Sequence, residues 1–148
     1  EARYAATRAL TEALVAPLSD ADATIQSMED ASPAKWHLAH TTWFFEEVIL
    51  KKFFPKYRQF DNRFNYLFNS YYESLKGYFP RNKRGLIFSP SFNEVMNYRK
   101  HVDDFFSKII YYFQDYHFKT NMNLKVCKVN YFYYLNWLFF LLQFLGEF

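Results

Sequence analysis

The chain has 148 residues and a formal net charge of +3 at neutral pH, a length that suits one domain with a single hydrophobic core. Its basic residues are interspersed with acids over most of the sequence, which argues against a nucleic-acid-binding stripe. The one cysteine, Cys127, excludes an internal disulfide and a cysteine-based zinc site. Such cysteine usage is typical of a reducing compartment, so we expect a cytoplasmic protein.

Few glycines and prolines interrupt the long periodic segments, and this favours an all-α fold in a single domain over residues 1–148. We expect a first helix from Ala2 to about Ala16, since Pro17 follows. Its predicted buried side consists of small and aliphatic residues: Ala6, Leu10, Ala13 and Leu14. The polar stretch LSDADATIQSMEDA that follows is expected to be a loop.

A second helix is predicted from Pro33 to about Phe53, with Ser32 as its N-cap and Pro33 at its first position. One face of this helix is expected to lie inward, because five residues, most of them aromatic or aliphatic, recur on it at steps of three or four: Trp36, His40, Trp43, Glu47 and Leu50. A histidine in such a stripe loses water on folding, so its imidazole needs either a hydrogen-bonding partner or a metal ion. Both alternatives remain open at this point.

Residues 54–90 form a long segment rich in Phe and Tyr, which favours packing over disorder, and we expect a short helix near residues 65–75. The next helix has a clear start, because Ser91 and Glu94 form a capping box. Helical spacing then continues for about six turns through Phe92, Val95, Arg99, Val102, Phe106, Ile109 and Phe113.

Past Tyr116 the pattern weakens, and the chain ends in the apolar run YFYYLNWLFFLLQFLG. The run is shorter than the roughly 20 residues of a membrane-spanning helix and contains Asn136 and Gln143, so we favour a buried fourth helix; a membrane segment and buried strands are the alternatives. Every alanine lies at or before Ala39, whereas almost all Phe and Tyr residues lie after Trp43. Either a codon bias or a C-terminal part that has drifted or been translated out of frame would produce this contrast.

Several segments together carry a family resemblance: RYAATRALTEALVAPLS, SPAKWHLAHTTWFFE, FDNRFNYLFNSYYE, PRNKRG and SPSFNEVMNYRKHVD. Over about residues 3–104 the chain resembles the N-terminal DinB-like domain of the ergothioneine-forming sulfoxide synthases, or EgtB-type hercynine oxygenases. The resemblance implies a four-helix bundle that contributes to a three-histidine non-haem Fe(II) site. It also implies a second domain, similar to formylglycine-generating enzymes, as the natural partner of this one.

Carried across by this resemblance, the first iron ligand falls on His40, and His37 is a weaker second candidate. Arg81 and Arg84 of PRNKRG match an R-x-x-R pair that is expected to clamp the carboxylates of the thiol substrate, cysteine or gamma-glutamylcysteine. Guanidinium groups suit this role because they bind carboxylates through two parallel hydrogen bonds. Without the resemblance, two arginines beside Lys83 would indicate a solvated surface patch.

The sequence departs from the family pattern after about residue 115. The other two iron ligands of the family come from an HEQQH-like segment, which is missing here, and no histidine follows His117. His101 falls where relatives carry a histidine that is not a ligand, so we expect a structural or surface role for it. One histidine cannot hold iron with a defined open face, so we expect that Fe(II) is not stably bound and that the isolated chain is inactive.

Three hypotheses follow. The first is a fragment of an iron-dependent oxygenase that joins a cysteine-type thiol to the imidazole ring of hercynine. The second is a non-catalytic or degenerate helical module of the same fold. The third is a membrane-associated helical protein, which the apolar C-terminal run and the lysines before it suggest.

Overall fold

The computed structural model describes residues 2–70 and 77–120, with side chains up to residue 111. Within these ranges the chain is helical and contains no β-strand, as the sequence predicts. The chain divides into a compact unit, Glu1–Tyr111, and a second unit that begins at Tyr112. All side chains discussed below belong to the first unit. The predicted fourth helix, and with it the choice between a buried and a membrane segment, lies outside the described residues.

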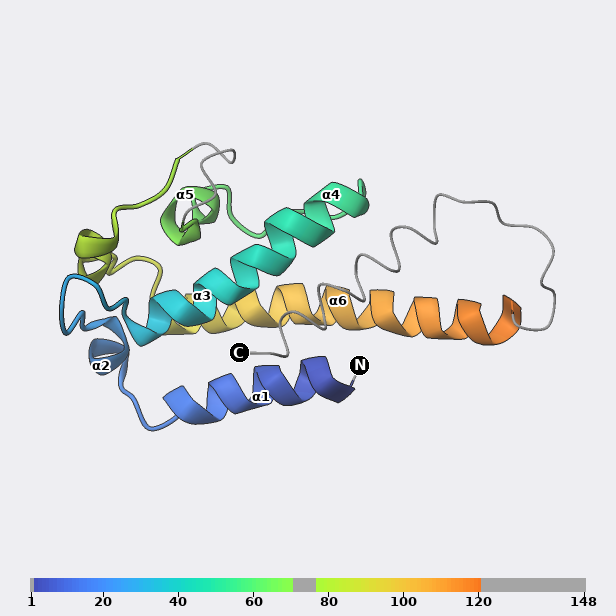
Figure 1. The fold of residues 1–148 in the computed structure, drawn as a ribbon, viewed down its shortest axis with the longest axis horizontal. Coiled ribbons are helices and arrows are strands. Elements are labelled where there is room, and N and C mark those ends of the chain that lie inside the picture. The colour runs from blue at the N-terminus through green and yellow to red at the C-terminus, as the bar shows by residue number, and fades with distance from the viewer. Residues whose placement is uncertain (1, 71–76, 121–148) are drawn as a thin grey trace. The chain divides into compact units, whose positions relative to one another are not determined.

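Three long helical segments build the first unit: α1 (Ala2–Val15), the segment that begins with α3 (Ala34–Phe44), and the part of α6 (Phe92–Thr120) up to Tyr111. Figure 1 shows α1 and α3 on either side of the first half of α6. The described ranges hold no helix that is both long and apolar enough to cross a bilayer.

The second predicted helix is confirmed in extent but not in its start. After α3 the same helix continues through a π-helical turn, η1 (Phe45–Leu50), and ends in α4 (Lys51–Phe53), at the predicted residue. Ser32 is not the N-cap: Pro33 holds that position, and the Ser32 hydroxyl instead accepts a hydrogen bond from Arg84. The Ser32 side chain therefore joins α3 to the segment of Arg84 and does not cap the helix.

The buried face predicted for α1 is wrong. Leu10 and Leu14 are 60% and 69% exposed, while Tyr4 and Arg8 are buried. Arg8 forms an ion pair with Asp103 of α6 at 3.0 Å, and its Nη2 atom donates to the Thr42 hydroxyl of α3 at 2.7 Å. A buried cation is tolerated when it is paired and hydrogen-bonded in this way, so a polar network, and not the aliphatic stripe, orients α1.

The start of α6 and its buried face are confirmed. The Ser91 amide donates to the Glu94 carboxylate at 2.8 Å, and the Glu94 amide donates to the Ser91 hydroxyl at 3.2 Å. Five of the predicted core positions are buried, namely Val95, Arg99, Val102, Phe106 and Ile109. The Arg99 guanidinium lies between α1 and α3, where it donates to the Thr11 hydroxyl and the Leu38 carbonyl.

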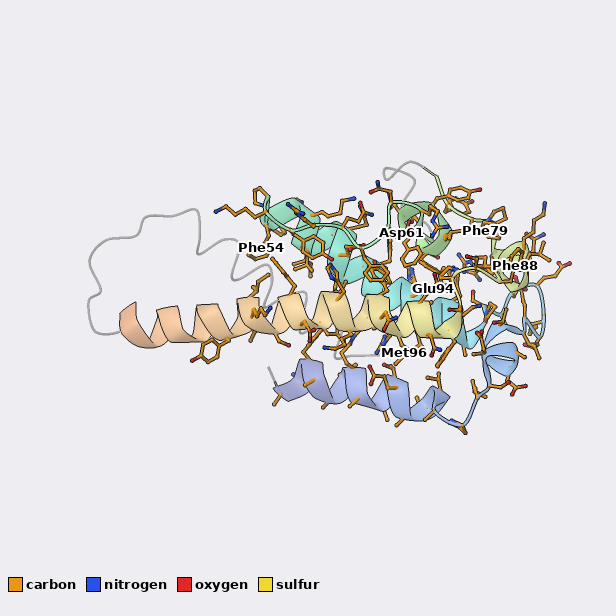
Figure 2. All side chains as sticks on the ribbon, turned by 180° about the vertical axis from the view of Figure 1, so that it is seen from behind. Phe54, Asp61, Phe79, Phe88, Glu94 and Met96 are labelled. Carbon is orange, nitrogen blue, oxygen red and sulfur yellow. The ribbon has the colours of Figure 1, made fainter. Side chains whose placement is uncertain are left out.

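Short helices also lie outside the three long segments, and one of them was predicted. The expected loop after α1 contains α2 (Asp20–Thr24), which begins at a capping box formed by Ser19 and Asp22. The aromatic segment contains α5 (Phe64–Phe68), close to the predicted short helix, and the 3₁₀ turn η3 (Arg81–Leu86). Figure 2 labels Phe79 and Phe88, which flank η3 in the sequence, near the end of the unit where α3 begins.

Candidate functional site

A pocket of about 310 Å³ opens beside the first turns of α3, a volume at the lower end of small-molecule sites. It lies among the loop that follows α2, the N-terminal half of α3, the residues after α5 and the turn η3. All four predicted site residues line it, although up to 47 positions separate them in the sequence. Its lining consists of Asp30, Ala31, Ser32, Trp36, His37, His40, Ser70, Arg81 and Arg84.

His40 has a defined orientation in this pocket. Its Nδ1 atom lies 2.7 Å from the Phe68 carbonyl oxygen, which can only accept, so the Nδ1 proton is donated to it. The ring is stacked between two indoles, with centroid distances of 4.5 Å to Trp36 and 5.5 Å to Trp43. With the proton on Nδ1, the Nε2 lone pair is available, and the described residues give it no hydrogen bond. A neutral imidazole held in this way suits either a metal ligand or a hydrogen-bond acceptor.

Helix α5 and its flanking residues hold the two indoles that enclose His40. The Trp36 indole N–H donates to the Leu67 carbonyl at 3.0 Å, and the Trp43 indole N–H donates to the Asn65 side chain at 3.0 Å. Because each ring is fixed by a hydrogen bond as well as by burial, the imidazole has little freedom to rotate. Burial lowers the pKa of His40, and Arg84 and His37 lower it further, against the opposing effect of the Phe68 hydrogen bond.

Arg84 supplies a nearly buried positive charge to the pocket. The residue is 2% exposed, and its guanidinium carbon lies 3.5 Å from the centroid of the Trp36 ring. Its Nη1 atom donates to the Ser32 hydroxyl at 2.8 Å, while its buried Nε atom has no acceptor within the described part of the chain. Burial and the neighbouring charge of Arg81 lower the pKa of Arg84 to about 10. The group is therefore still cationic at neutral pH.

No carboxylate of the described residues forms an ion pair with Arg84. Arg81, on the same turn, is half-buried and repels it. The positive charges of Arg81 and the desolvated Arg84 repel each other, which raises the free energy of the pocket. An anion placed between them would lower this free energy. The alternative of a solvated surface patch does not hold for Arg84, because its side chain is buried over Trp36.

Gln26, which the sequence did not single out, holds the turn that carries both arginines. Its side-chain amide donates to the Arg81 carbonyl at 2.8 Å and accepts from the Gly85 amide at 2.7 Å. Gly85 is needed for this approach, since a Cβ atom there would lie 2.8 Å from the Gln26 Cβ. A lone glutamine in a polar segment carries no sequence signal for such a role, because its partners are backbone atoms some 55 to 59 residues away.

The other histidines contribute little to a metal site. His37 is exposed at the edge of the pocket, and its pKa is lowered by partial burial and by both arginines. His101 lies 3.1 Å from the Arg58 carbonyl and contacts the rings of Tyr57 and Phe60, in agreement with a structural role. The side chain of His117 lies outside the described residues.

The donor set around His40 does not fit an iron site of three nitrogen ligands. Within the described ranges, no group of three His, Cys, Asp or Glu side chains converges on a point. The stacked, hydrogen-bonded His40 has the form of one ligand, and His37 is the nearest second nitrogen. We therefore derive no reaction step through a metal from these residues.

The fold and the site define a class of protein: an all-helical domain with one imidazole and two guanidinium groups in a single pocket. A family model of the DinB superfamily matches residues 3–147, and the chain therefore belongs to the DinB superfamily. No curated protein shows significant similarity to it.

Proposed function

We propose that this chain is the DinB-type domain of a protein related to the hercynine oxygenases, and that its pocket binds the carboxylate of a cysteine-type thiol. The observation that carries the proposal is the convergence of His40, Arg81 and Arg84 on one pocket. These are the residues that the resemblance selects as the first iron ligand and the carboxylate clamp.

The electrostatics of the pocket support the assignment of Arg81 and Arg84 to a carboxylate. A guanidinium that is desolvated over an indole gains more from an anion than an exposed one, because the effective dielectric constant around it is lower. Gln26 holds the backbone of the turn at both ends, and Ser32 and Trp36 hold the Arg84 guanidinium. This group therefore does not have to be ordered when the ligand binds.

His40 would stand beside the bound thiol as a neutral imidazole. Family resemblance gives it the role of an Fe(II) ligand, and the Phe68 carbonyl would then be the partner that fixes its tautomer. The remaining ligands, the hercynine site and the partner domain similar to formylglycine-generating enzymes lie beyond what this pocket provides. In this proposal the isolated chain binds the thiol substrate and does not turn it over.

Binding of L-cysteine, followed by isothermal titration or by tryptophan fluorescence, tests the proposal. We expect Arg84→Gln and Arg81→Gln to weaken binding about tenfold or more, as is usual for loss of a charge-assisted hydrogen bond. Arg63→Gln is the matched control, because Arg63 is exposed and pairs with Asp61 away from the pocket lining. Absence of binding to the parent protein, or equal losses in all three variants, would refute the proposal.

A second candidate function is a non-catalytic DinB-fold module, and the lack of a three-donor metal group within the described ranges favours it. Retention of about one iron per chain after anaerobic loading, if it is lost in His40→Ala, would exclude the non-catalytic module. We expect no stable retention by one histidine, so L-cysteine binding is the measurement that separates the two functions. Absence of binding favours the non-catalytic module.

A further inference from the structure

The pocket carries a negative charge as well as its two positive ones. Asp30 belongs to the loop before α3 and lines the same pocket as Arg81 and Arg84. Its carboxylate is exposed and forms no hydrogen bond or ion pair with any other residue that the structure describes. The acid and the buried guanidinium of Arg84 therefore share one small cavity without neutralising each other.

Such a separated pair of charges matches a ligand that carries both signs. If Arg84 and Arg81 hold the anionic group of a ligand, the rest of that ligand lies in the same cavity of about 310 Å³. There the Asp30 carboxylate is available to accept hydrogen bonds from a cationic group of the ligand. Ser32 and Ser70 add two hydroxyl groups to the lining, which can donate to or accept from such a ligand. A purely anionic ligand would gain from the arginines but would be repelled by Asp30.

We propose that Asp30 determines specificity in this pocket by binding an ammonium group, so that the preferred ligand is a zwitterionic amino acid and not a simple carboxylate. The inference rests on the proposed function, in which the arginine pair binds the carboxylate. Asp30 discriminates between ligands through charge. A ligand without an ammonium group brings only its carboxylate into the pocket, and the two negative charges then repel each other.

The test compares three small thiols by isothermal titration. L-cysteine carries both charges, 3-mercaptopropionate lacks the ammonium, and cysteamine lacks the carboxylate. For the parent protein we expect L-cysteine to bind about tenfold more tightly than 3-mercaptopropionate, as a charge-assisted contact implies. Cysteamine should bind most weakly, since it brings a positive charge to the two arginines.

Asp30→Asn should lower the affinity for L-cysteine about tenfold and leave that for 3-mercaptopropionate unchanged or higher. The matched control is Glu29→Gln, which removes a charge from the adjacent exposed residue that does not line the pocket. Thermal melts of both variants establish that they fold.

The failures of the two proposals are distinguishable. Equal affinity of the parent protein for L-cysteine and 3-mercaptopropionate would overturn the role of Asp30 and leave carboxylate binding intact. Equal weakening of both ligands by Asp30→Asn would also overturn it, because a merely structural residue behaves so. If the parent protein binds none of the three compounds, both proposals are wrong.

Discussion

Glu46 offers a sharp test of how the first unit is held together. Its side chain is completely buried in the π-helical turn η1. It accepts hydrogen bonds from the Tyr57 hydroxyl at 2.6 Å, the Tyr98 hydroxyl at 2.7 Å and the Phe60 amide at 3.0 Å. Among the described residues no cation pairs with it. The carboxylate therefore joins η1, the segment after α4 and helix α6 through hydrogen bonds alone.

Glu46→Leu removes the acceptor and keeps the three donors. Tyr98 is fully buried, so its hydroxyl cannot find water, and each buried donor left unpaired costs about 1–3 kcal/mol. The 9% exposure of Tyr57 lets its hydroxyl recover part of the loss. We expect the free energy of unfolding to fall by about 3 kcal/mol, with about 2 from the Tyr98 hydroxyl and about 1 from the Tyr57 hydroxyl. The Phe60 amide adds little, because Phe60 is 38% exposed and water can replace the lost acceptor.

Removing the two tyrosine hydroxyls as well should reverse most of this loss. A buried carboxylate without a cation is itself costly, so its replacement together with its partners by apolar groups is close to neutral. The triple variant Glu46→Leu, Tyr57→Phe, Tyr98→Phe is therefore expected within about 1 kcal/mol of the parent protein.

Urea denaturation followed by circular dichroism measures these differences, with equal m-values as the check that unfolding stays comparable. A loss below about 1 kcal/mol for Glu46→Leu would show that the hydrogen bonds do not hold the three segments together. A triple variant as unstable as the single one would show that the orphaned hydroxyl groups are not the cause.

Three further predictions concern the site and α1. Gly85→Ala should lower the free energy of unfolding by about 1–2 kcal/mol, because the added Cβ overlaps Gln26. The same variant should bind L-cysteine more weakly, and an unchanged affinity would contradict the role of Gln26. Leu14→Gln should change the unfolding free energy by less than about 0.5 kcal/mol in urea titrations, since its side chain is exposed, whereas a larger loss would restore the predicted aliphatic face. The metal-free protein should lose stability as the pH falls from 7 through 6.5, the ordinary pKa of histidine. In this range the unfolded His40 takes up a proton that the buried ring resists, and His40→Gln should flatten the pH dependence.

Local chemistry allowed the start of α6 to be predicted from the sequence. The capping box of Ser91 and Glu94 involves atoms three residues apart, so its geometry depends on the backbone nearby and little else. The inward stripe of α3 and η1 was predictable for a similar reason, and Trp36, Trp43 and Leu50 are buried on it. Glu46 fits the same spacing but was missed, because an acidic residue is rarely fully buried and its partners Tyr57 and Tyr98 lie 11 and 52 positions away.

Residue types and the family resemblance selected His40, Arg81 and Arg84, but the sequence did not show that they share a pocket. That depends on the loop before α3, on the residues after α5 and on η3, whose positions follow from contacts such as those of Gln26. Asp30 and Ser70 join the site through the same contacts.

Helix α1 shows most directly where sequence patterns stop and the tertiary structure decides. Its helical form follows from a local alanine-rich sequence, and its length was predicted to within a residue or two. The side that it buries depends on Asp103, which lies 95 positions from Arg8. Helix formation is governed by residues within a few positions of one another, whereas the burial of a charged side chain depends on a partner that only the folded chain brings near.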